Sequence, residues 1–393
     1  MAELLTSLIP LLLWGSASLL TMWALPKSYL TRILSLPVIW LLTFLSLLTA
    51  NQISDVLFPG ASITLGSVLV FYLPWSHKLL FLTPRPSTPA WLTRYKIWNN
   101  PRGIIMPITM SSSSTSSSSS SSKQVSQTRF LLARSTKSLT LYLIDLHLVK
   151  GLILPSALIG VSPSDFSPEM ELKALLSFSL TTRQLLLRSA ISLQWIWSAY
   201  FFLTFYHSLV SILFVSVLGW DAPHEWPPLF GRIGEAYTVR RFWGGAAAGF
   251  WHRLTVPTYS SYAEMLCEFL PKVLPSPFKI GLRRRRGKKT VAAGVIFLMS
   301  GLSHALSGWA MGDHGLARDV VFFLANFLVC ALEVAVGKSV IGRAIKRLLP
   351  RVVRKLVGVV WVFAWFFLVS PVWMYPKIYP TLVAEMPKFE VDL

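Results

Sequence analysis

The chain has 393 residues, of which 53% are hydrophobic and 14% are charged. Soluble domains carry about 25% charged residues, so the composition excludes a soluble globular protein and indicates a polytopic membrane protein. The formal net charge of +20 does not indicate nucleic-acid binding, because the basic residues fall in loops between apolar segments, as membrane topology requires. Cys267 and Cys330 give neither a disulfide framework nor a metal-ligand spacing, and we predict no metal site.

Three apolar segments open the chain. Residues 4–25 lack the basic flank of a secretory signal, so we expect a retained membrane span. Residues 33–48 form a second predicted span, somewhat short and interrupted by Pro37. Residues 63–75 are the centre of a third span. We therefore treat residues 1–82 as an N-terminal three-span membrane segment.

Residues 83–138 are predicted to form a basic, serine-rich cytosolic linker. Residues 111–122 are all serine apart from Thr115, and such a tract cannot bury a core. Residues 139–393 hold the remaining spans and are expected to form the functional region.

The segment 139–154 is apolar but carries Asp145, His147 and Lys150. Four basic loops should all be cytosolic: 26–32, 78–137, 272–289 and 338–355. An even number of crossings must separate the second loop from the third, and residues 185–218 supply one. We therefore predict that 139–154 also crosses, with its three ionisable side chains facing the protein interior. Two alternatives are a surface-lying segment at 139–154 and a tight pair of spans within 185–218.

Three more apolar segments, 290–312, 320–336 and 356–373, bring the count to eight spans. The N-terminus then lies outside the cytosol. The predicted fold class is all-α: a polytopic transmembrane helical bundle with cytosolic loops.

His304 is the one ionisable residue in the apolar segment before Gly312. A histidine in a membrane span is costly unless it faces a protein interior, a cavity or a partner. Imidazole also moves protons near neutral pH, and burial would keep it neutral and able to accept one. Small residues surround His304: Ser300, Gly301, Ser303, Ala305, Ser307 and Gly308. The alternative is a packing histidine that hydrogen-bonds a neighbouring span.

The cytosolic segment 221–290 is rich in aromatic residues beside basic ones. Its most distinctive stretches read WPPLFG (226–231), YTVRRFWG (237–244) and FWHR (250–253). Such residues suit a membrane interface, or a site that holds an aromatic or anionic ligand through stacking and ion pairing.

These stretches, followed by Ser300-Gly-Leu-Ser-His304, resemble the wax synthase-like branch of the membrane-bound O-acyltransferases. Arg102-Gly103-Ile104 is similar to an element of the fungal members, so the resemblance runs from about Asn99 to the C-terminus. It implies an all-helical membrane bundle with a tunnel that acyl-CoA enters from the cytosol. The family's intramembrane histidine matches His304, and its second catalytic polar residue matches His252.

One departure from the family lies between Phe-Trp-Gly and Trp-His. Residues Gly245–Phe250 intervene there, about four more than the family pattern and close to one helical turn. The extra residues could loop out at the glycines, could disturb the site, or could reflect an error in the gene boundary.

The resemblance implies an enzyme that transfers an acyl group from acyl-CoA to a hydroxyl group. His304 would act as the base and His252 would donate to the thioester carbonyl or orient the acceptor, with no covalent enzyme intermediate. We expect substrate contacts from Arg240, Arg241, Trp243, Trp251 and Arg253. The run Arg283–Lys289 could bind coenzyme A, but is better explained as a topology anchor that binds anionic lipid headgroups.

We expect acetyl-CoA as co-substrate, no permanently bound cofactor, and a terpenoid or meroterpenoid acceptor of secondary metabolism. The expected location is the endoplasmic reticulum membrane. Alternatives are a wax ester synthase acting on long-chain alcohols, a proton-coupled transporter with a histidine and carboxylate path, and an inactive relative of the acyltransferases.

Overall fold

The computed structural model of the protein describes residues 2–53, 60–84, 90–103, 126–171, 180–244, 249–273, 285–313 and 315–389. Within these ranges the regular secondary structure is entirely helical, and there is no strand. Eight of the described helices are long and apolar enough to cross a membrane. The predicted all-α, multi-pass fold with eight spans is thus confirmed. The serine tract, Arg283 and Arg284 lie outside the described residues.

The eight candidate spans follow the predicted apolar segments. They are Leu5–Ala24, Tyr29–Gln52, Ala61–Leu82, Gln127–Leu158, Thr182–Val217, Gly287–Ala310, Leu316–Lys338 and Arg351–Ala384. All but the last of residues 185–218 fall in one continuous helical stretch, Thr182–Val217, so the alternative of a tight pair of spans there is wrong.

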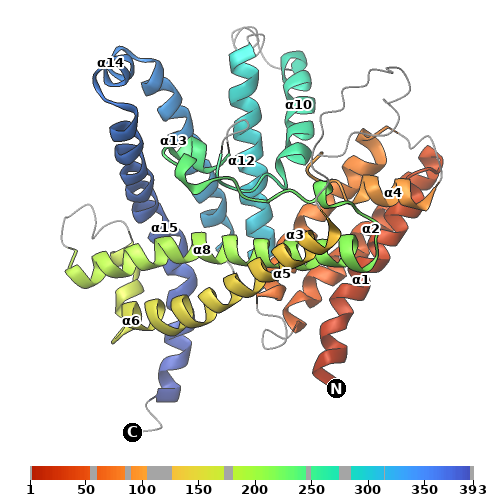
Figure 1. The fold of residues 1–393 in the computed structure, drawn as a ribbon, viewed down its shortest axis with the longest axis horizontal. Helices are drawn as coiled ribbons and strands as arrows, with labels where there is room; N and C mark the ends of the chain where they lie inside the picture. Colours follow the sequence, from red (N-terminus) through yellow and green to blue (C-terminus); the bar gives the residue numbers. More distant parts are fainter. Residues whose placement is uncertain are drawn as a thin grey trace. The chain divides into compact units, whose positions relative to one another are not determined.

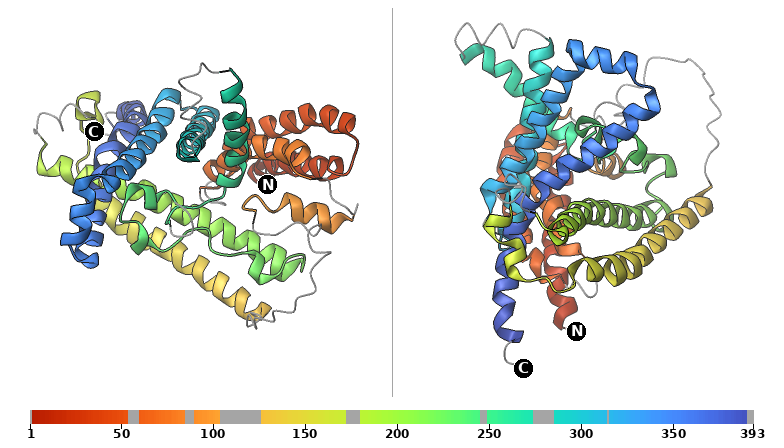
Figure 2. Two further views of the ribbon diagram at one scale, coloured as in Figure 1. Left: turned by 90° about the horizontal axis from the view of Figure 1, so that it is seen from above. Right: turned by 90° about the vertical axis from the view of Figure 1, so that its left-hand side faces the viewer.

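The chain divides into two compact units, each built from segments that are distant in sequence. Unit 1 comprises residues 1–131, 213–227 and 253–316, and unit 2 comprises residues 132–212, 228–252 and 317–393. Figures 1 and 2 show the helices coloured along the chain.

Unit 1 is a set of helices packed side by side. Its helices are α1 (Ala2–Ala24), α2 (Tyr29–Thr49), α3 (Ala61–His77), α4 (Trp91–Trp98), α10 (Val256–Val273) and α12 (Arg285–Ala310). Helix α1 packs on α2, α2 on α3, α3 on α12, and α12 on α10. Buried side chains from α2, α3 and α10, among them Ile39, Phe71, Trp75 and Tyr259, share one apolar core.

Helix α2 is continuous through Pro37, so the predicted interruption of the second span is wrong. A proline removes one backbone donor, but the 21-residue helix keeps its other bonds on both sides. Helix α3 begins after Gly60, whose φ of +65° suits glycine.

Unit 2 contains the two longest of the described helices, α8 (Thr182–Ile212) and α15 (Arg351–Phe389). Its other helices are α5 (Gln127–Leu143), α6 (Leu154–Leu158), α9 (Val239–Phe242), α13 (Leu316–Lys338) and α14 (Val340–Leu348). Helix α5 belongs to unit 2 from Leu132 onward, and α13 from Ala317 onward. A π-helical segment (Ile144–Ile153) joins α5 to α6. Figure 1 shows that α8 crosses α15 steeply instead of running alongside it.

The segment 139–154 lies within a candidate span, as predicted. Asp145 is buried, accepts a hydrogen bond from Trp197 Nε1 at 2.8 Å and pairs with Lys150 Nζ at 3.0 Å. His147 and Lys150 are exposed, so the prediction that all three face the interior is wrong for these two. Lys150 reaches back to Asp145 and lies 5.8 Å from the centre of the Phe202 ring, so its charge is compensated without burial.

Candidate active site

His304 lies on α12 in unit 1, and its side chain is exposed. The residues one turn before and after it, which share its side of the helix, are Ser300, Gly301, Ser307 and Gly308. None of these side chains is large enough to cover an imidazole. The expected burial of His304 is therefore wrong, since its side chain is exposed beside small neighbours.

Small residues of α12 also allow close helix packing. Ser303 Oγ lies 2.6 Å from the hydroxyl of Tyr259 on α10. On α3, a Cβ added to Gly66 would lie 3.2 Å from Ser307 Oγ, so that contact requires a glycine or a shift of its neighbour. Burial raises the pKa of Tyr259 to about 12, which keeps its hydroxyl protonated at neutral pH.

Arg240 and Arg241 lie on α9 in unit 2. The Thr238 side chain accepts a hydrogen bond from Arg241 N at 3.0 Å and caps the helix. The carboxylate of Glu333 on α13 accepts from Val239 N at 2.8 Å and from Arg240 N at 2.9 Å. These contacts satisfy donors that a helix N-terminus leaves unpaired, and they fix α9 to α13 while the Arg240 side chain stays exposed.

The Arg241 guanidinium is held by an ion pair. Its Nη1 lies 2.8 Å from Glu235 Oε2, and its Cζ lies 4.6 Å from the centre of the Tyr237 ring. Lys355 Nζ contacts the other Glu235 oxygen at 2.9 Å. The hydrogen bond from Lys355, with the positive charges of Lys355, Arg241 and Arg351, lowers the pKa of Glu235.

Trp243 and Trp251 belong to an aromatic cluster of unit 2. Trp243 Nε1 donates to Asn326 Oδ1 at 2.9 Å, and the Asn326 side chain is fully buried. Trp251 is buried and stacks on Phe242, with ring centres 5.1 Å apart. Protein groups thus engage both tryptophans, and their contact with substrate stays a prediction.

Three glycines of the aromatic segment meet backbone to backbone. Gly231 N donates to Phe250 O at 2.8 Å, and a Cβ added to Gly231 would lie 2.0 Å from Gly249 O. A Cβ added to Gly249 would lie 2.0 Å from Gly244 Cα, and Gly244 has a φ of +89°. Only glycine fits such contacts. This explains the glycines that end the stretches WPPLFG (226–231) and YTVRRFWG (237–244).

Hydrogen bonds join the chain on the two sides of the extra residues. Phe250 N donates to Arg241 O at 2.9 Å, and Trp251 N donates to Phe242 O at 2.7 Å. Gly245–Ala248 lie outside the described residues. The Phe-Trp-Gly and Trp-His elements therefore lie side by side, and the extra residues do not separate them.

His252 is half-buried against two aromatic rings. Its ring centre lies 5.7 Å from that of Phe230 and 5.8 Å from that of Trp251. Unit 2 thus brings His252 together with the Phe-Trp-Gly element, whereas Arg253, which is exposed, and His304 belong to unit 1. Joint action of the two histidines stays a prediction.

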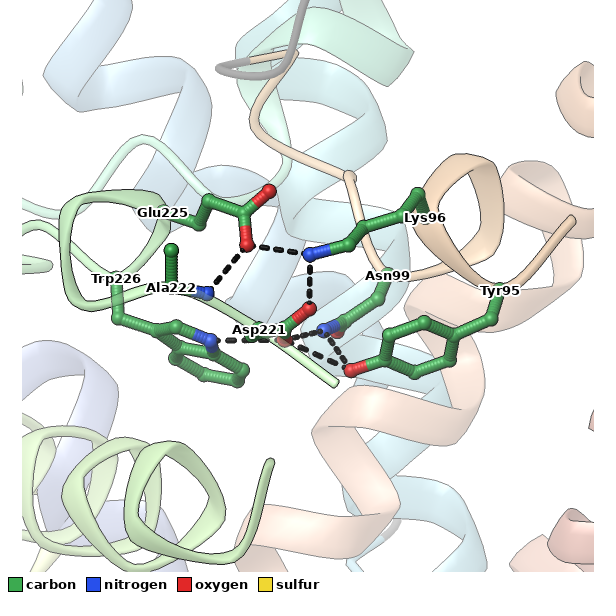
Figure 3. Close-up of polar contacts among 7 residues, drawn as sticks. All are labelled: Tyr95, Lys96, Asn99, Asp221, Ala222, Glu225 and Trp226. Atoms are coloured by element: carbon green, nitrogen blue, oxygen red, sulfur yellow. Dashed lines mark hydrogen bonds and ion pairs between the residues drawn. The ribbon is translucent and has the colours of Figure 1, made fainter. Parts of the chain in front are cut away.

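Unit 1 contains a buried polar cluster that the sequence analysis missed (Figure 3). Asp221 Oδ2 accepts hydrogen bonds from Tyr95 Oη at 2.8 Å, Trp226 Nε1 at 2.9 Å and Asn99 Nδ2 at 3.1 Å. Its Oδ1 pairs with Lys96 Nζ at 2.5 Å. Burial, followed by the hydrogen bond to Asp221, raises the pKa of Tyr95.

The same cluster joins two stretches that carry the family resemblance. Lys96 also pairs with Glu225, and Arg102 Nη1 donates to Pro227 O at 3.0 Å. Burial lowers the pKa of Arg102, and the charge of Arg253 lowers it further. The signal that could have revealed the cluster is the pair Asp221 and Glu225, which are isolated acids directly after a long apolar run.

These features define a multi-pass helical membrane protein with one histidine in an apolar helix and a second histidine in an aromatic, basic segment. Residues 226–325 match the model of the membrane bound O-acyl transferase family. This range includes His252, His304 and the three meeting glycines, and it confirms the family resemblance drawn from the sequence.

Several curated fungal acetyltransferases are similar to the chain. Acetyltransferase nanB of Aspergillus nanangensis is 26% identical over 191 residues, which are 47% of this chain and 43% of that protein. Acetyltransferase spyB of Aspergillus fumigatus is 32% identical over 184 residues, 42% of this chain and 28% of that protein. Acetyltransferase aurG of Calcarisporium arbuscula is 32% identical over 187 residues, 46% of this chain and 42% of that protein. The chain thus spans less than half the length of these relatives. No solved structure matches it.

Proposed function

We propose that this protein is a membrane-bound O-acyltransferase that moves an acyl group from acyl-CoA to a hydroxyl group of a lipophilic acceptor. One observation supports this most directly. In the region that matches the family, backbone hydrogen bonds hold the Trp251-His252 element beside the Phe242-Trp243-Gly244 element. The extra residues therefore do not argue for an inactive relative, and a transporter finds no support in the family match.

In this proposal His304 accepts the proton of the acceptor hydroxyl as its oxygen attacks the thioester carbonyl. The carbon–sulfur bond breaks, and the departing thiolate of coenzyme A takes the proton from His304. His252 donates to the oxyanion that develops on the carbonyl. The exposure of His304 supports the first role, because the residues on its side of α12 are small.

The proposed donor is acetyl-CoA and the proposed acceptor is a terpenoid or meroterpenoid alcohol of secondary metabolism. The support is the similarity to fungal proteins named acetyltransferases. We further propose that coenzyme A enters a tunnel from the cytosol past Arg240, and that the protein resides in the endoplasmic reticulum.

The test is ester formation by membranes that contain the protein or its His304→Ala variant. Labelled acetyl-CoA and long-chain acyl-CoA would be offered with sterol, terpenoid and fatty alcohols. We expect an acetyl ester that is lost in the variant. Esters formed only from long-chain donors would support the wax ester alternative, and no ester from folded protein would reject the proposal. An ester unaffected by His304→Ala would reject the assigned base.

A further inference from the structure

Glu235, Tyr237, Arg241 and Lys355 form a cluster at the surface of unit 2, which we call the Glu235 cluster. The Glu235 carboxylate bridges the two cations at 2.8 and 2.9 Å. The Tyr237 ring centre lies 4.6 Å from Arg241 Cζ and 5.1 Å from Lys355 Nζ. The carboxylate and both cations are about 30% exposed, so a dissolved ligand can reach them.

Backbone packing, not only the ion pairs, holds this cluster together. A Cβ added to Gly358 on α15 would lie 2.2 Å from Tyr237 O. Gly358 follows Lys355 by three residues, about one helical turn. Tyr237 therefore stays beside Lys355 when Glu235 moves away. Arg241 and Lys355 then still lie against the Tyr237 ring.

The charges of the Glu235 cluster do not balance. Two cations face one carboxylate, and residues 338–354 carry six further basic side chains and no acid. The hydrogen bond from Lys355, followed by the surrounding positive charges, lowers the pKa of Glu235, in keeping with a strongly positive surface. Solvent-exposed ion pairs contribute little to stability, so an anion of higher charge can displace the carboxylate.

A phosphate monoester is such an anion. It carries about −1.5 to −2 charges at neutral pH and three acceptor oxygens. The guanidinium of Arg241 matches two phosphate oxygens at once, and the ammonium of Lys355 supplies a point charge. A carboxylate offers one negative charge to the same two donors.

We propose that Arg241 and Lys355 bind a phosphate monoester, the 3′-phosphate of the acyl-CoA nucleotide, and that Glu235 occupies this position when the nucleotide is absent. The inference rests on the proposed function and adds Lys355 and Glu235 to it. The phosphate of an anionic lipid headgroup has the same chemistry and is the competing source.

The experiment measures binding, not turnover. The full chain in phosphatidylcholine nanodiscs would be titrated calorimetrically with adenosine 3′,5′-bisphosphate and with adenosine 5′-phosphate, which lacks the 3′-phosphate. The variants are Lys355→Met, Lys355→Arg and Glu235→Gln. Lys338→Met removes an exposed lysine from the same basic stretch and serves as the control, and thermal unfolding shows that each variant is folded.

We expect Lys355→Met to weaken bisphosphate binding about tenfold or more, Lys355→Arg to restore it, and Glu235→Gln to tighten it. Lys338→Met should bind like the parent, and adenosine 5′-phosphate should not distinguish the variants. Equal affinities for the parent, Lys355→Met and Glu235→Gln would overturn the proposal, as would a parent that does not bind.

A second arm identifies the source of the phosphate. Phosphatidic acid in the nanodisc could occupy Lys355 and so abolish nucleotide binding to the parent. In that case the phosphate position at Arg241 and Lys355 belongs to a lipid headgroup, and the nucleotide assignment is overturned. The His304→Ala variant should bind the bisphosphate as the parent does. A parent that binds the bisphosphate but forms no ester with any donor would count against the proposed function alone.

Discussion

The Gly231→Ala variant should destabilise the aromatic segment by steric overlap. Its new Cβ would lie 2.0 Å from Gly249 O, 3.1 Å from the Gly249 carbonyl carbon and 3.5 Å from Phe250 Cα. All three are backbone atoms, so no side chain can rotate to make room. Because Cβ contacts below 3.0 Å are essentially never seen, the two backbones must separate by about 1 Å.

That separation would also break the hydrogen bond from Gly231 N to Phe250 O, which is 2.8 Å long. Overpacking costs about 1–3 kcal/mol, and a lost hydrogen bond costs about 0.5–1.5 kcal/mol. We therefore expect the free energy of unfolding to fall by about 1.5–4.5 kcal/mol. Because Trp251 and His252 follow Phe250, ester formation should fall as well.

Thermal unfolding of the purified protein, followed by tryptophan fluorescence, measures the loss. Gly234→Ala is the matched control, because a Cβ there meets no atom within 4 Å and the residue has no positive φ. The control should lie within about 0.5 kcal/mol of the parent. If Gly231→Ala unfolds at the same temperature as Gly234→Ala, the close backbone contact between Gly231 and Gly249 does not exist as described.

Three further variants test other contacts. Asp221→Asn replaces a carboxylate oxygen of the buried cluster by an amide donor and should cost about 3–5 kcal/mol of unfolding free energy, whereas Glu268→Gln, at an exposed acid on α10, should change it by under about 0.5 kcal/mol. Glu333→Gln leaves one donor of α9 without an acceptor and should cost about 1–3 kcal/mol; an unchanged unfolding temperature would contradict the capping role. The pKa of Tyr259 is raised to about 12, so its neutral form stabilises the fold below pH about 10 and this contribution disappears as the pH rises towards 12. A Tyr259→Phe variant should lack that loss when unfolding is measured across this range, and parallel curves would refute the assignment.

The eight spans were predictable because span length and apolar composition are local properties of the sequence. Pro37 misled the prediction, since a proline signals a break but does not require one in a long apolar helix. The position of Asp145 was also predictable from the cost of an ionisable group in a membrane. The exposure of His147 was not predictable, because neighbouring helices determine which side of a helix is covered.

The candidate site was predictable in its residue types and not in its contacts. The access to His304 follows from four small residues at helical spacing, and that signal was present in the sequence. The meeting of Gly231 with Gly249 and the capping of α9 by Glu333 depend on partners far away along the chain. Spacing alone cannot reveal such partners.

The hydrogen bonds from Phe250 and Trp251 to Arg241 and Phe242 have a consequence for labelling the protein. They hold the backbone in place directly before His252. The position of its imidazole therefore does not depend on how many residues lie between Gly244 and Gly249. Doubling the length of a loop costs only about 0.6 kcal/mol of closure entropy. A fluorescent or affinity peptide placed there would report on the neighbourhood of His252 from within a few residues while leaving the histidine in register.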